Sequence, residues 1–308
     1  MFLFGETELK NPISISGGKI NKVSDLSTAL AEVAEAGFEY IDFWLSYFCD
    51  GEDAPMRKPD WEKFIRGVGG EIAAAGLKVG QCHAYWRHKR EIGEDFSFSM
   101  PSALTLRNFD ACAMLGCERL VFHPLERWMP MPDESVRDRI IAVNAEWFGS
   151  MTGHAADCGI EIHIENLFDH KHKGLPTDPG FAFSRAEDLI RLHDLIGSDR
   201  VFFCLDTGHA NIAGQDIPAM IRAYGKRLGS LHLNDNYGKI SPIYEDLHLF
   251  PGYGRIDWKG VFGALAEVGY SGTLNMEPIG ELARMPHEIR VAMMKTAREI
   301  VDFMQRSV

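Results

Sequence analysis

Side chains that bind metal ions or transfer protons follow six short apolar runs of this sequence, each time at the same relative place. In chain order they belong to His83, His123, Glu165, Asp206, His232 and Glu277. Steps of about 40 residues separate the first four, close to one eighth of the 308-residue chain. This recurrence predicts that the six side chains meet at one site, because repeated strand-helix units bring their strand ends together.

The chemistry expected of such a cluster is that of a divalent metal centre. Carboxylates crowded into a narrow site repel one another, and a bound cation removes that repulsion. An oxygen-rich ligand set suits Mn²⁺ first, and also Mg²⁺ or Co²⁺. The predicted ligands are Glu165, Asp206, His232 and Glu277. Recruitment of further histidines would favour Zn²⁺, in one or several ions. These histidines are His83, His123, His209 and His248.

The elements that must position these residues alternate regularly along the chain. Helix-like stretches end in glycine and lead into apolar or β-branched runs, as in "ADCGIEIHIE" at 156–165, which is typical of a helix C-cap followed by a strand. The apolar periodicity predicts helices at 24–36, 60–75, 101–115, 134–157, 184–196, 216–227, 257–268 and 287–305.

Eight alternations of strand and helix predict an α/β fold of the (β/α)₈ TIM-barrel type. "PISIS" at 12–16 supplies the first strand, and no G-x-G-x-x-G follows it, which argues against an open dinucleotide-binding sheet. No linker rich in proline, glycine or serine divides the chain. We therefore expect residues 1–308 to form a single domain.

Composition excludes several partners. The formal charge of −12 disfavours nucleic acid and anionic membranes. No membrane-spanning apolar stretch and no secretory signal is apparent in the sequence, so a cytoplasmic location is expected. The six cysteines form no C-x-x-C pair, which predicts reduced, packed thiols rather than disulfides or a cysteine-type zinc site.

Five segments carry a family resemblance. They are "IEN" at 164–166, "LDTGH" at 205–209, "LHLNDN" at 231–236, "EDLHLFPGYGRIDW" at 245–258 and "GYSGTLNMEP" at 269–278. With these segments most of the chain resembles the xylose isomerase-like TIM-barrel superfamily, which contains sugar and sugar-phosphate isomerases and epimerases as well as endonuclease IV.

The resemblance implies one metal ion held by the four predicted ligands, with Glu165 and Glu277 also transferring protons. It places Asp246 and His248 near the barrel mouth, on the loop after the seventh strand. Lys171 and Gly238 stand where ketose 3-epimerases of the tagatose and psicose kind carry an acid and an arginine.

The resemblance also includes a second ligand pattern, that of the trinuclear zinc site of endonuclease IV. This chain has a matching residue at each of its positions, namely His83, His123, Glu165, Asp206, His209, His232, Asp246, His248 and Glu277. Its acidic charge argues against DNA as the substrate, because phosphate neutralisation by Lys and Arg supplies most of the affinity for DNA.

The expected reaction removes a proton from the carbon next to a carbonyl of a sugar or sugar derivative, through a metal-stabilised enediolate. Reprotonation would make the enzyme an isomerase or epimerase. Expulsion of a β leaving group would make it a lyase, similar to inosose or dehydroshikimate dehydratases or to enzymes that cleave C-glycosides of 3-keto sugars. A non-catalytic scaffold would be expected to have lost some of the ligands, which are all present here.

Further residues are expected to contact the substrate. His209 is a candidate proton donor or hydroxyl ligand. Aromatic residues in the loops after the second and third strands can stack on a sugar ring, or alternatively pack at the rim, in a homo-oligomer or against a partner subunit. The predicted substrate-binding residues are His83, His123, Asp246, His248, Trp86 and Trp44.

Overall fold

The computed structural model describes most of the chain in seven segments. They are residues 9–17, 24–85, 92–126, 134–168, 182–238, 246–278 and 282–308. Trp86, the basic run at 87–90 and Lys171 lie outside the described residues.

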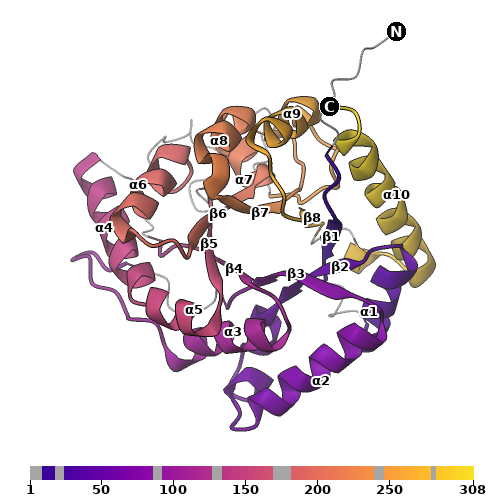
Figure 1. The fold of residues 1–308 in the computed structure, drawn as a ribbon, viewed down its shortest axis with the longest axis horizontal. Coiled ribbons are helices and arrows are strands. Elements are labelled where there is room, and N and C mark those ends of the chain that lie inside the picture. Colours follow the sequence, from indigo (N-terminus) through magenta and orange to yellow (C-terminus); the bar gives the residue numbers. More distant parts are fainter. Residues whose placement is uncertain are drawn as a thin grey trace.

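Eight parallel strands form a nearly closed barrel (Figure 1). In chain order they are β1 (Ile13–Ser16), β2 (Tyr40–Trp44), β3 (Lys78–His83), β4 (Arg119–Phe122), β5 (Glu161–Glu165), β6 (Val201–Asp206), β7 (Leu228–His232) and β8 (Leu274–Met276). Neighbours in sequence pair in parallel from β1 to β7, and β8 pairs with β1. The predicted TIM barrel is confirmed.

The barrel closes between β7 and β8 through one residue beyond β7. The Leu233 amide donates to the Asn275 carbonyl at 2.7 Å, and the Glu277 amide donates to the Leu233 carbonyl at 3.1 Å. These two bonds continue the parallel ladder past His232. They therefore fix Glu277 beside the end of β7.

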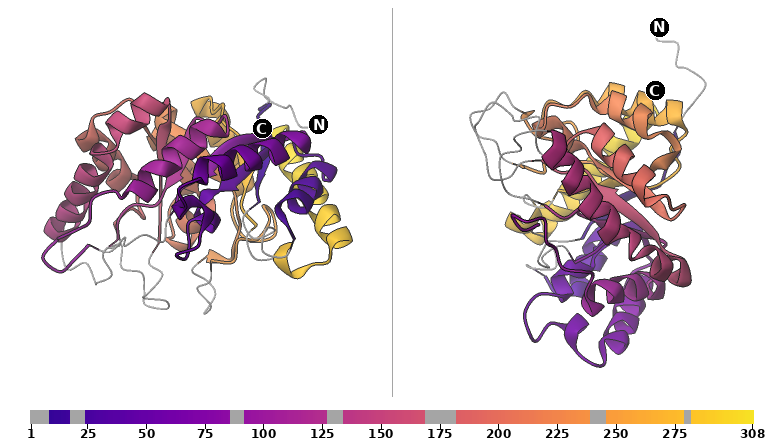
Figure 2. Two further views of the ribbon diagram at one scale, coloured as in Figure 1. Left: turned by 90° about the horizontal axis from the view of Figure 1, so that it is seen from below. Right: turned by 90° about the vertical axis from the view of Figure 1, so that its left-hand side faces the viewer.

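Helices surround the strands, as the side views in Figure 2 show. The main ones are α1 (Leu26–Glu35), α2 (Trp61–Ala74), α3 (Ala103–Met114), α4 (Glu134–Gly149), α5 (Thr152–Cys158), α6 (Ala186–Ile196), α7 (Thr207–Ile212), α8 (Ile217–Tyr224), α9 (Trp258–Val268) and α10 (His287–Gln305). Short 3₁₀ turns lie at Leu45–Phe48, Pro55–Arg57, Gly225–Arg227 and Leu282–Arg284.

Two helix predictions need correction. The predicted helix 134–157 is two helices, because the Ser150 hydroxyl donates to the Trp147 carbonyl and the Thr152 hydroxyl to the Gly149 carbonyl, and such local bonds compete with the helical ladder. The residues after Asp206, which lie outside the predicted helices, form α7. The Asp206 carboxylate caps this helix by accepting the His209 amide at 2.7 Å.

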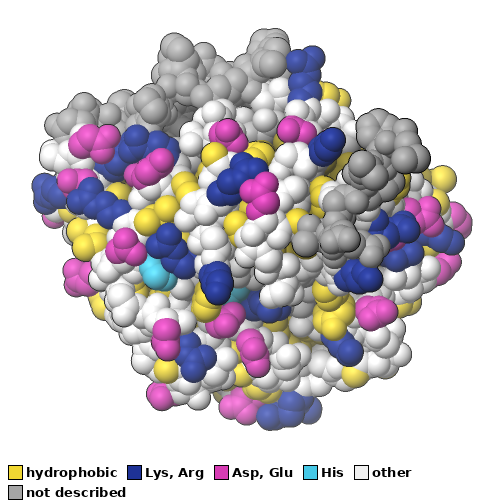
Figure 3. All heavy atoms as spheres, turned by 45° about the horizontal axis from the view of Figure 1, so that its top comes forward, with side chains coloured by type: hydrophobic (Ala, Val, Ile, Leu, Met, Phe, Trp, Pro, Cys, Tyr) yellow, Lys and Arg dark blue, Asp and Glu magenta, His cyan; other side chains and the backbone are white. Residues whose placement is uncertain are grey.

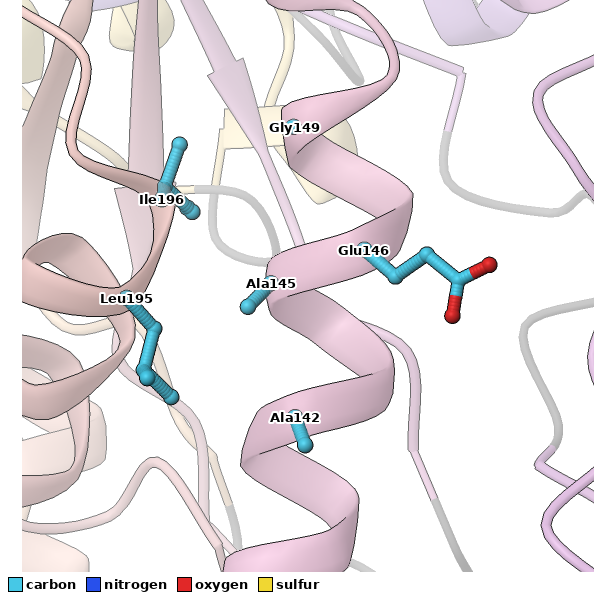
Figure 4. A pocket seen from close by; sticks show the side chains of 6 residues that line it. All are labelled: Ala142, Ala145, Glu146, Gly149, Leu195 and Ile196. Carbon is cyan, nitrogen blue, oxygen red and sulfur yellow. The ribbon is translucent and has the colours of Figure 1, made fainter.

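The outer layer has a groove of about 460 Å³ between α4 and α6 (Figure 4). Ala142 and Ala145 face Leu195 and Ile196 across it, and the Glu146 carboxylate points away from this apolar wall. Among the described residues, Glu146 is the one charged side chain that lines the groove. Among the described residues, no helix is both long and apolar enough to span a membrane.

A buried ion pair joins the first and last helices of the ring. Glu32 on α1 is fully buried, and its carboxylate accepts hydrogen bonds from both Nε (2.8 Å) and Nη2 of Arg290 on α10. His287 Nδ1 lies 3.0 Å from the same carboxylate. The pair thus connects α1 to α10 beside β1, where the chain completes the barrel.

Replacing Glu32 with glutamine should destabilise the fold. The substitution leaves the Arg290 guanidinium buried without its counter-charge, which costs about 3 kcal/mol. Urea unfolding of Glu32→Gln at pH 7 measures the loss. Glu35→Gln is the matched control, since Glu35 is an exposed residue of the same helix, and its unfolding free energy should change by less than about 0.5 kcal/mol. Equal losses in the two variants would contradict the assignment.

The Glu32 contribution should also depend on pH. Burial raises the pKa of Glu32, whereas hydrogen bonds from Arg290 and His287 lower it. Together with the charges of these two residues they outweigh burial, so the pKa lies below its ordinary value. A folded-state pKa below the unfolded one stabilises the protein above the unfolded pKa, and this stabilisation is lost as the pH falls through the folded value. The stability difference between wild type and Glu32→Gln should therefore shrink below about pH 4.

Candidate metal centre and active site

Carboxylates from three strand ends surround the imidazole of His232. His232 Nδ1 lies 3.2 Å from Glu165 Oε1, 3.5 Å from Glu277 Oε2 and 3.9 Å from Asp206 Oδ2. All four side chains are buried. They come from the carboxyl ends of β5, β6 and β7 and from the residue after β8, so the structure brings the four predicted ligands together.

The donors fit a divalent cation. Among the described residues, Glu165 Oε2, Glu277 Oε2 and His232 Nδ1 are buried atoms with no hydrogen bond, and a buried polar atom without a partner is costly. Burial raises the pKa of Glu277 to about 8. The negative charges of Asp206 and Glu165 add to this rise, and the imidazoles of His232 and His248 oppose it. The four residues would hold the ion through one nitrogen and several carboxylate oxygens.

Asparagine side chains orient Asp206. Asn166 bonds both backbone groups of Asp206, at 2.7 Å to its amide and 3.0 Å to its carbonyl. Asn234 Nδ2 donates to Asp206 Oδ2 at 2.8 Å. A Cβ on Gly208 would lie 1.8 Å from Asn234 Oδ1. The glycine of "LDTGH" is therefore required for this packing. We did not single out either asparagine from the sequence, although "IEN" and "LHLND" contain them.

A second cluster adjoins the other oxygen of Glu165. His123 Nε2 lies 3.1 Å and His83 Nε2 3.5 Å from Glu165 Oε2, and the two imidazole nitrogens are 3.2 Å apart. The Trp44 ring lies against His83, with centroids 4.8 Å apart, and its indole nitrogen donates to Asp42. Trp44 is only 7% exposed. Trp44 thus packs against His83, next to the cluster around Glu165, and its predicted contact with the substrate stays a prediction.

A third cluster joins α7 to the loop after β7. Asp246 Oδ2 lies 2.6 Å from His248 Nε2 and 3.5 Å from His209 Nε2. His209 Nδ1 is 2.9 Å from the Asn166 carbonyl and 3.3 Å from Glu165 Oε1. His248 Nδ1 is 2.9 Å from the carbonyl of Glu277. The predicted catalytic residue His209 and the predicted substrate-binding residues Asp246 and His248 thus border the predicted metal ligands.

A buried carboxylate that the sequence analysis did not identify anchors this loop. Asp235 accepts the backbone amides of Asn236 (2.9 Å), Gly252 (3.1 Å), Arg255 (3.0 Å) and Ile256 (3.2 Å), and the indole of Trp258 (2.8 Å).

Two further features hold the same loop in place. A Cβ on Gly254 would lie 2.2 Å from Asp235 Oδ1, so the second glycine of "GYG" allows the backbone to approach the carboxylate. His248 has a left-handed backbone with φ of 46°, which is uncommon for a residue other than glycine. The anchored loop carries Asp246 and His248 to the mouth.

With this geometry established, comparison with known proteins identifies the family. The family model for the xylose isomerase-like TIM barrel matches residues 30–305. The chain belongs to this family, as its five segments indicated.

Curated relatives include sugar epimerases. The D-psicose 3-epimerase of Enterocloster bolteae is 36% identical over 124 residues, which are 40% of this chain and 35% of that protein. The L-ribulose 3-epimerase of Mesorhizobium japonicum is 27% identical over 262 residues, covering 82% of this chain and 75% of that protein. The first four curated relatives are matched over only 35% to 51% of their own lengths.

Solved structures share the fold. The crystal structure of the IOLI protein with a bound zinc atom superposes with a TM-score of 0.70 at 19% identity, covering 96% of this chain and 99% of that one. At this identity the likeness concerns the fold alone.

Substituting Asp235 with asparagine should loosen the loop after β7. The amide side chain of asparagine lacks the negative charge that accepts these N–H groups, and losing charged hydrogen bonds costs about 2 kcal/mol of local stability. Hydrogen-deuterium exchange of residues 249–258 should therefore become faster in Asp235→Asn.

Asp216→Asn provides the control for this experiment. Asp216 also accepts a backbone amide, that of Ala219, but it does so at the exposed start of α8. This variant should leave exchange in 249–258 unchanged. Unchanged exchange in Asp235→Asn as well would show that the carboxylate does not hold the loop.

Proposed function

We propose that this protein is a divalent-metal-dependent isomerase or epimerase of a small carbohydrate or carbohydrate derivative. The single observation that supports this most is the convergence of Glu165, Asp206 and Glu277 oxygens within 3.9 Å of His232 Nδ1. The similarity to sugar 3-epimerases agrees with it. Manganese is the proposed metal, the cytoplasm the proposed location, and residues 1–308 the proposed single domain.

Glu165 and Glu277 have the placement needed for proton transfer. Their carboxylates lie on either side of β7, which ends at His232: Glu165 ends β5, two strands away, and Glu277 directly follows β8. One carboxylate removes the proton next to the carbonyl, and the other returns a proton from its own side. A bound divalent ion would supply positive charge against the negative charge that develops on the substrate oxygens.

Neighbouring groups would bind the substrate hydroxyls and exclude water. His209, Asp246 and His248 offer imidazole and carboxylate hydrogen-bonding groups at the edge of the metal site. His83 and His123 offer imidazole groups on the other side of Glu165. Polar groups on two sides of the acid-base pair suit a polyhydroxylated molecule, whose orientation decides which carbon loses its proton.

The substrate is proposed to differ from that of the psicose-type enzymes. Gly238 stands where those enzymes carry an arginine, and it has a left-handed backbone with φ of 62° beside the Asn211 side chain. An arginine side chain at this position would be strained. We therefore propose a substrate that needs no cationic contact at this point, such as an inosose or a keto sugar derivative.

Solvent deuterium exchange tests the proposed reaction. In D₂O with Mn²⁺, a panel of ketoses, inososes and 3-keto glycosides should include a compound that takes up deuterium next to its carbonyl. Glu165→Gln and Glu277→Gln should slow this uptake by about 10²-fold or more, since each removes one proton-transfer group. Mass spectrometry or NMR of the recovered sugar measures it.

Glu161→Gln is the matched control for that test. Glu161 lies on β5 like Glu165 but at the opposite end, where it bonds His163 at 3.1 Å, and its substitution should leave the uptake rate unchanged. Deuterium uptake without loss of a group supports the isomerase. Loss of a substituent would favour the lyase alternative, and no uptake with any compound would contradict both.

A second candidate function is zinc-dependent phosphodiester cleavage of the endonuclease IV type. The observation that favours it is the presence of two further groups with donor atoms close enough to share an ion, His83 with His123 and Glu165, and His209 with Asp246 and His248. Against it stands the charge of −12. On the face drawn in Figure 3, acidic and basic side chains are interspersed, without a continuous basic surface among the described residues.

Metal analysis and an abasic DNA duplex separate the two candidates. We expect about one tightly bound ion at the mouth and no cleavage, because a single ion held by four ligands already compensates the carboxylates. Asp206→Asn should lower the mouth occupancy, and chelation should abolish deuterium uptake. Three zinc ions at the mouth together with efficient nicking would reverse the ranking.

A further inference from the structure

A cysteine, a histidine and an aspartate meet between two outer helices, away from the barrel mouth. Asp110 Oδ1 of α3 lies 3.2 Å from His154 Nε2 of α5. Cys158 Sγ of α5 lies 3.3 Å from the same oxygen and 3.6 Å from His154 Nε2. Each of the three atoms is thus within 3.6 Å of the other two.

Helix geometry explains why two of these side chains face the same way. His154 and Cys158 are four residues apart on α5, so they lie one turn apart on one face. The Phe109 ring of α3 contacts the His154 ring edge to face, with centroids 5.7 Å apart. Asp110 follows Phe109 and completes the group from the neighbouring helix.

The spacing matches the edge of a zinc tetrahedron. Zinc binds nitrogen and oxygen at about 2.0–2.2 Å and thiolate sulfur at about 2.3 Å, so two ligands of a tetrahedron lie roughly 3.3–3.7 Å apart. The three observed separations, from 3.2 to 3.6 Å, are close to this range. An ion could therefore bind without rearrangement of either helix.

Access and charge also suit an ion. The side chains of His154 and Asp110 are 32% and 37% exposed, and Cys158 is partly exposed, whereas the other five cysteines are buried. A thiolate and a carboxylate together offer two negative charges, and an imidazole that binds a metal through its nitrogen adds none. They balance one divalent ion.

We propose that Asp110, His154 and Cys158 form an open Zn²⁺ site on the outside of the barrel, with water as the fourth ligand. On binding, the Cys158 S–H bond is replaced by a sulfur-zinc bond, and the proton is released to solvent. No electron transfer is involved. The site is independent of the mouth, whose predicted ligands include no sulfur.

Two other interpretations of the cluster differ from a metal site. Burial raises the pKa of the Cys158 thiol to about 11, and the Asp110 carboxylate adds to this shift, so a metal-free Cys158 is protonated at neutral pH and is a poor nucleophile. In a purely structural cluster the thiol would donate to Asp110 Oδ1 beside His154, and no ion would bind. Zinc would replace the thiol proton, and all three groups would then coordinate one ion.

Cobalt substitution tests the site on the full-length protein. Co²⁺ bound to a thiolate gives an intense near-ultraviolet charge-transfer band, which oxygen and nitrogen ligands at the mouth do not give. We expect wild-type protein titrated with Co²⁺ to develop this band with the intensity of one thiolate-bound ion per chain, in addition to any Co²⁺ held at the mouth, and with release of a proton. Zn²⁺ should displace the cobalt and remove the band.

Variants assign the band to its ligands. Cys158→Ser should abolish it, and Asp110→Asn should weaken Co²⁺ binding by about tenfold or more. Two controls should keep the band: Asp206→Asn, which removes a predicted ligand at the mouth, and Cys117→Ser, which alters the buried thiol group of Cys82, Cys112 and Cys117. Circular dichroism checks that each variant is folded.

The outcomes decide the proposal in either direction. A band in wild type that persists in Cys158→Ser, or disappears only in Cys117→Ser, would overturn it. So would the absence of a band at saturating Co²⁺ in folded, reduced protein. Deuterium uptake into the sugar substrate should be the same in Cys158→Ser and wild type, since the site lies outside the barrel.

Discussion

The barrel brings several negatively charged carboxylates close together at its mouth. The architecture of the mouth depends on how these charges are compensated. Three carboxylates, at the ends of β5 and β6 and directly after β8, approach the imidazole at the end of β7 within 3.9 Å, in a place where none of the four residues is more than 2% exposed. Burial disfavours the charged imidazolium, but neighbouring groups, Glu277 and Glu165 among them, raise the pKa of His232 well above its ordinary value. Even so, one imidazolium offsets only one of three negative charges. A divalent cation is the simplest compensation, and the unbonded oxygens of Glu165 and Glu277 are available for it.

The surrounding polar residues prevent this charged cluster from rearranging. Asn166 and Asn234 hold Asp206 by its backbone and its carboxylate, and Asp235 fixes the loop that delivers Asp246 and His248 through five hydrogen bonds. Gly208 and Gly254 are needed because these side chains fill the space where a Cβ would stand. Ligands held in this way lose little entropy when an ion binds, which favours affinity and exact placement of the reacting groups.

The barrel and its mouth could be predicted from sequence because both rest on periodic signals. Glycine-ended helices and apolar runs recur with nearly constant spacing, and the polar residue at each strand end, such as Glu165 or Asp206, follows directly from that register. Other features depend on contacts between distant segments. The packing of Trp44 against His83 and the four donors that residues 252–258 supply to Asp235 have no local pattern. The cap of α7 by Asp206 is a local bond, but apolar periodicity does not report it. Competition by the Ser150 and Thr152 hydroxyls likewise divided a helix whose apolar period continued.

The two proposed proton-transfer residues occupy different surroundings, which bears on how the mouth treats the two faces of a substrate. Each oxygen of Glu165 has imidazole neighbours: His232 and His209 beside Oε1, and His83 and His123 beside Oε2. Hydrogen bonds and the positive charge of nearby imidazoles stabilise the charged form of Glu165.

Glu277 has His232 and His248 near one oxygen, and its backbone carbonyl rather than its carboxylate is the closer neighbour of His248. A pair of carboxylates with such unequal stabilisation favours one direction of proton transfer over the other, since the less stabilised anion is the stronger base. The two carboxylates thus have chemically distinct surroundings, although one ends β5 and the other directly follows β8.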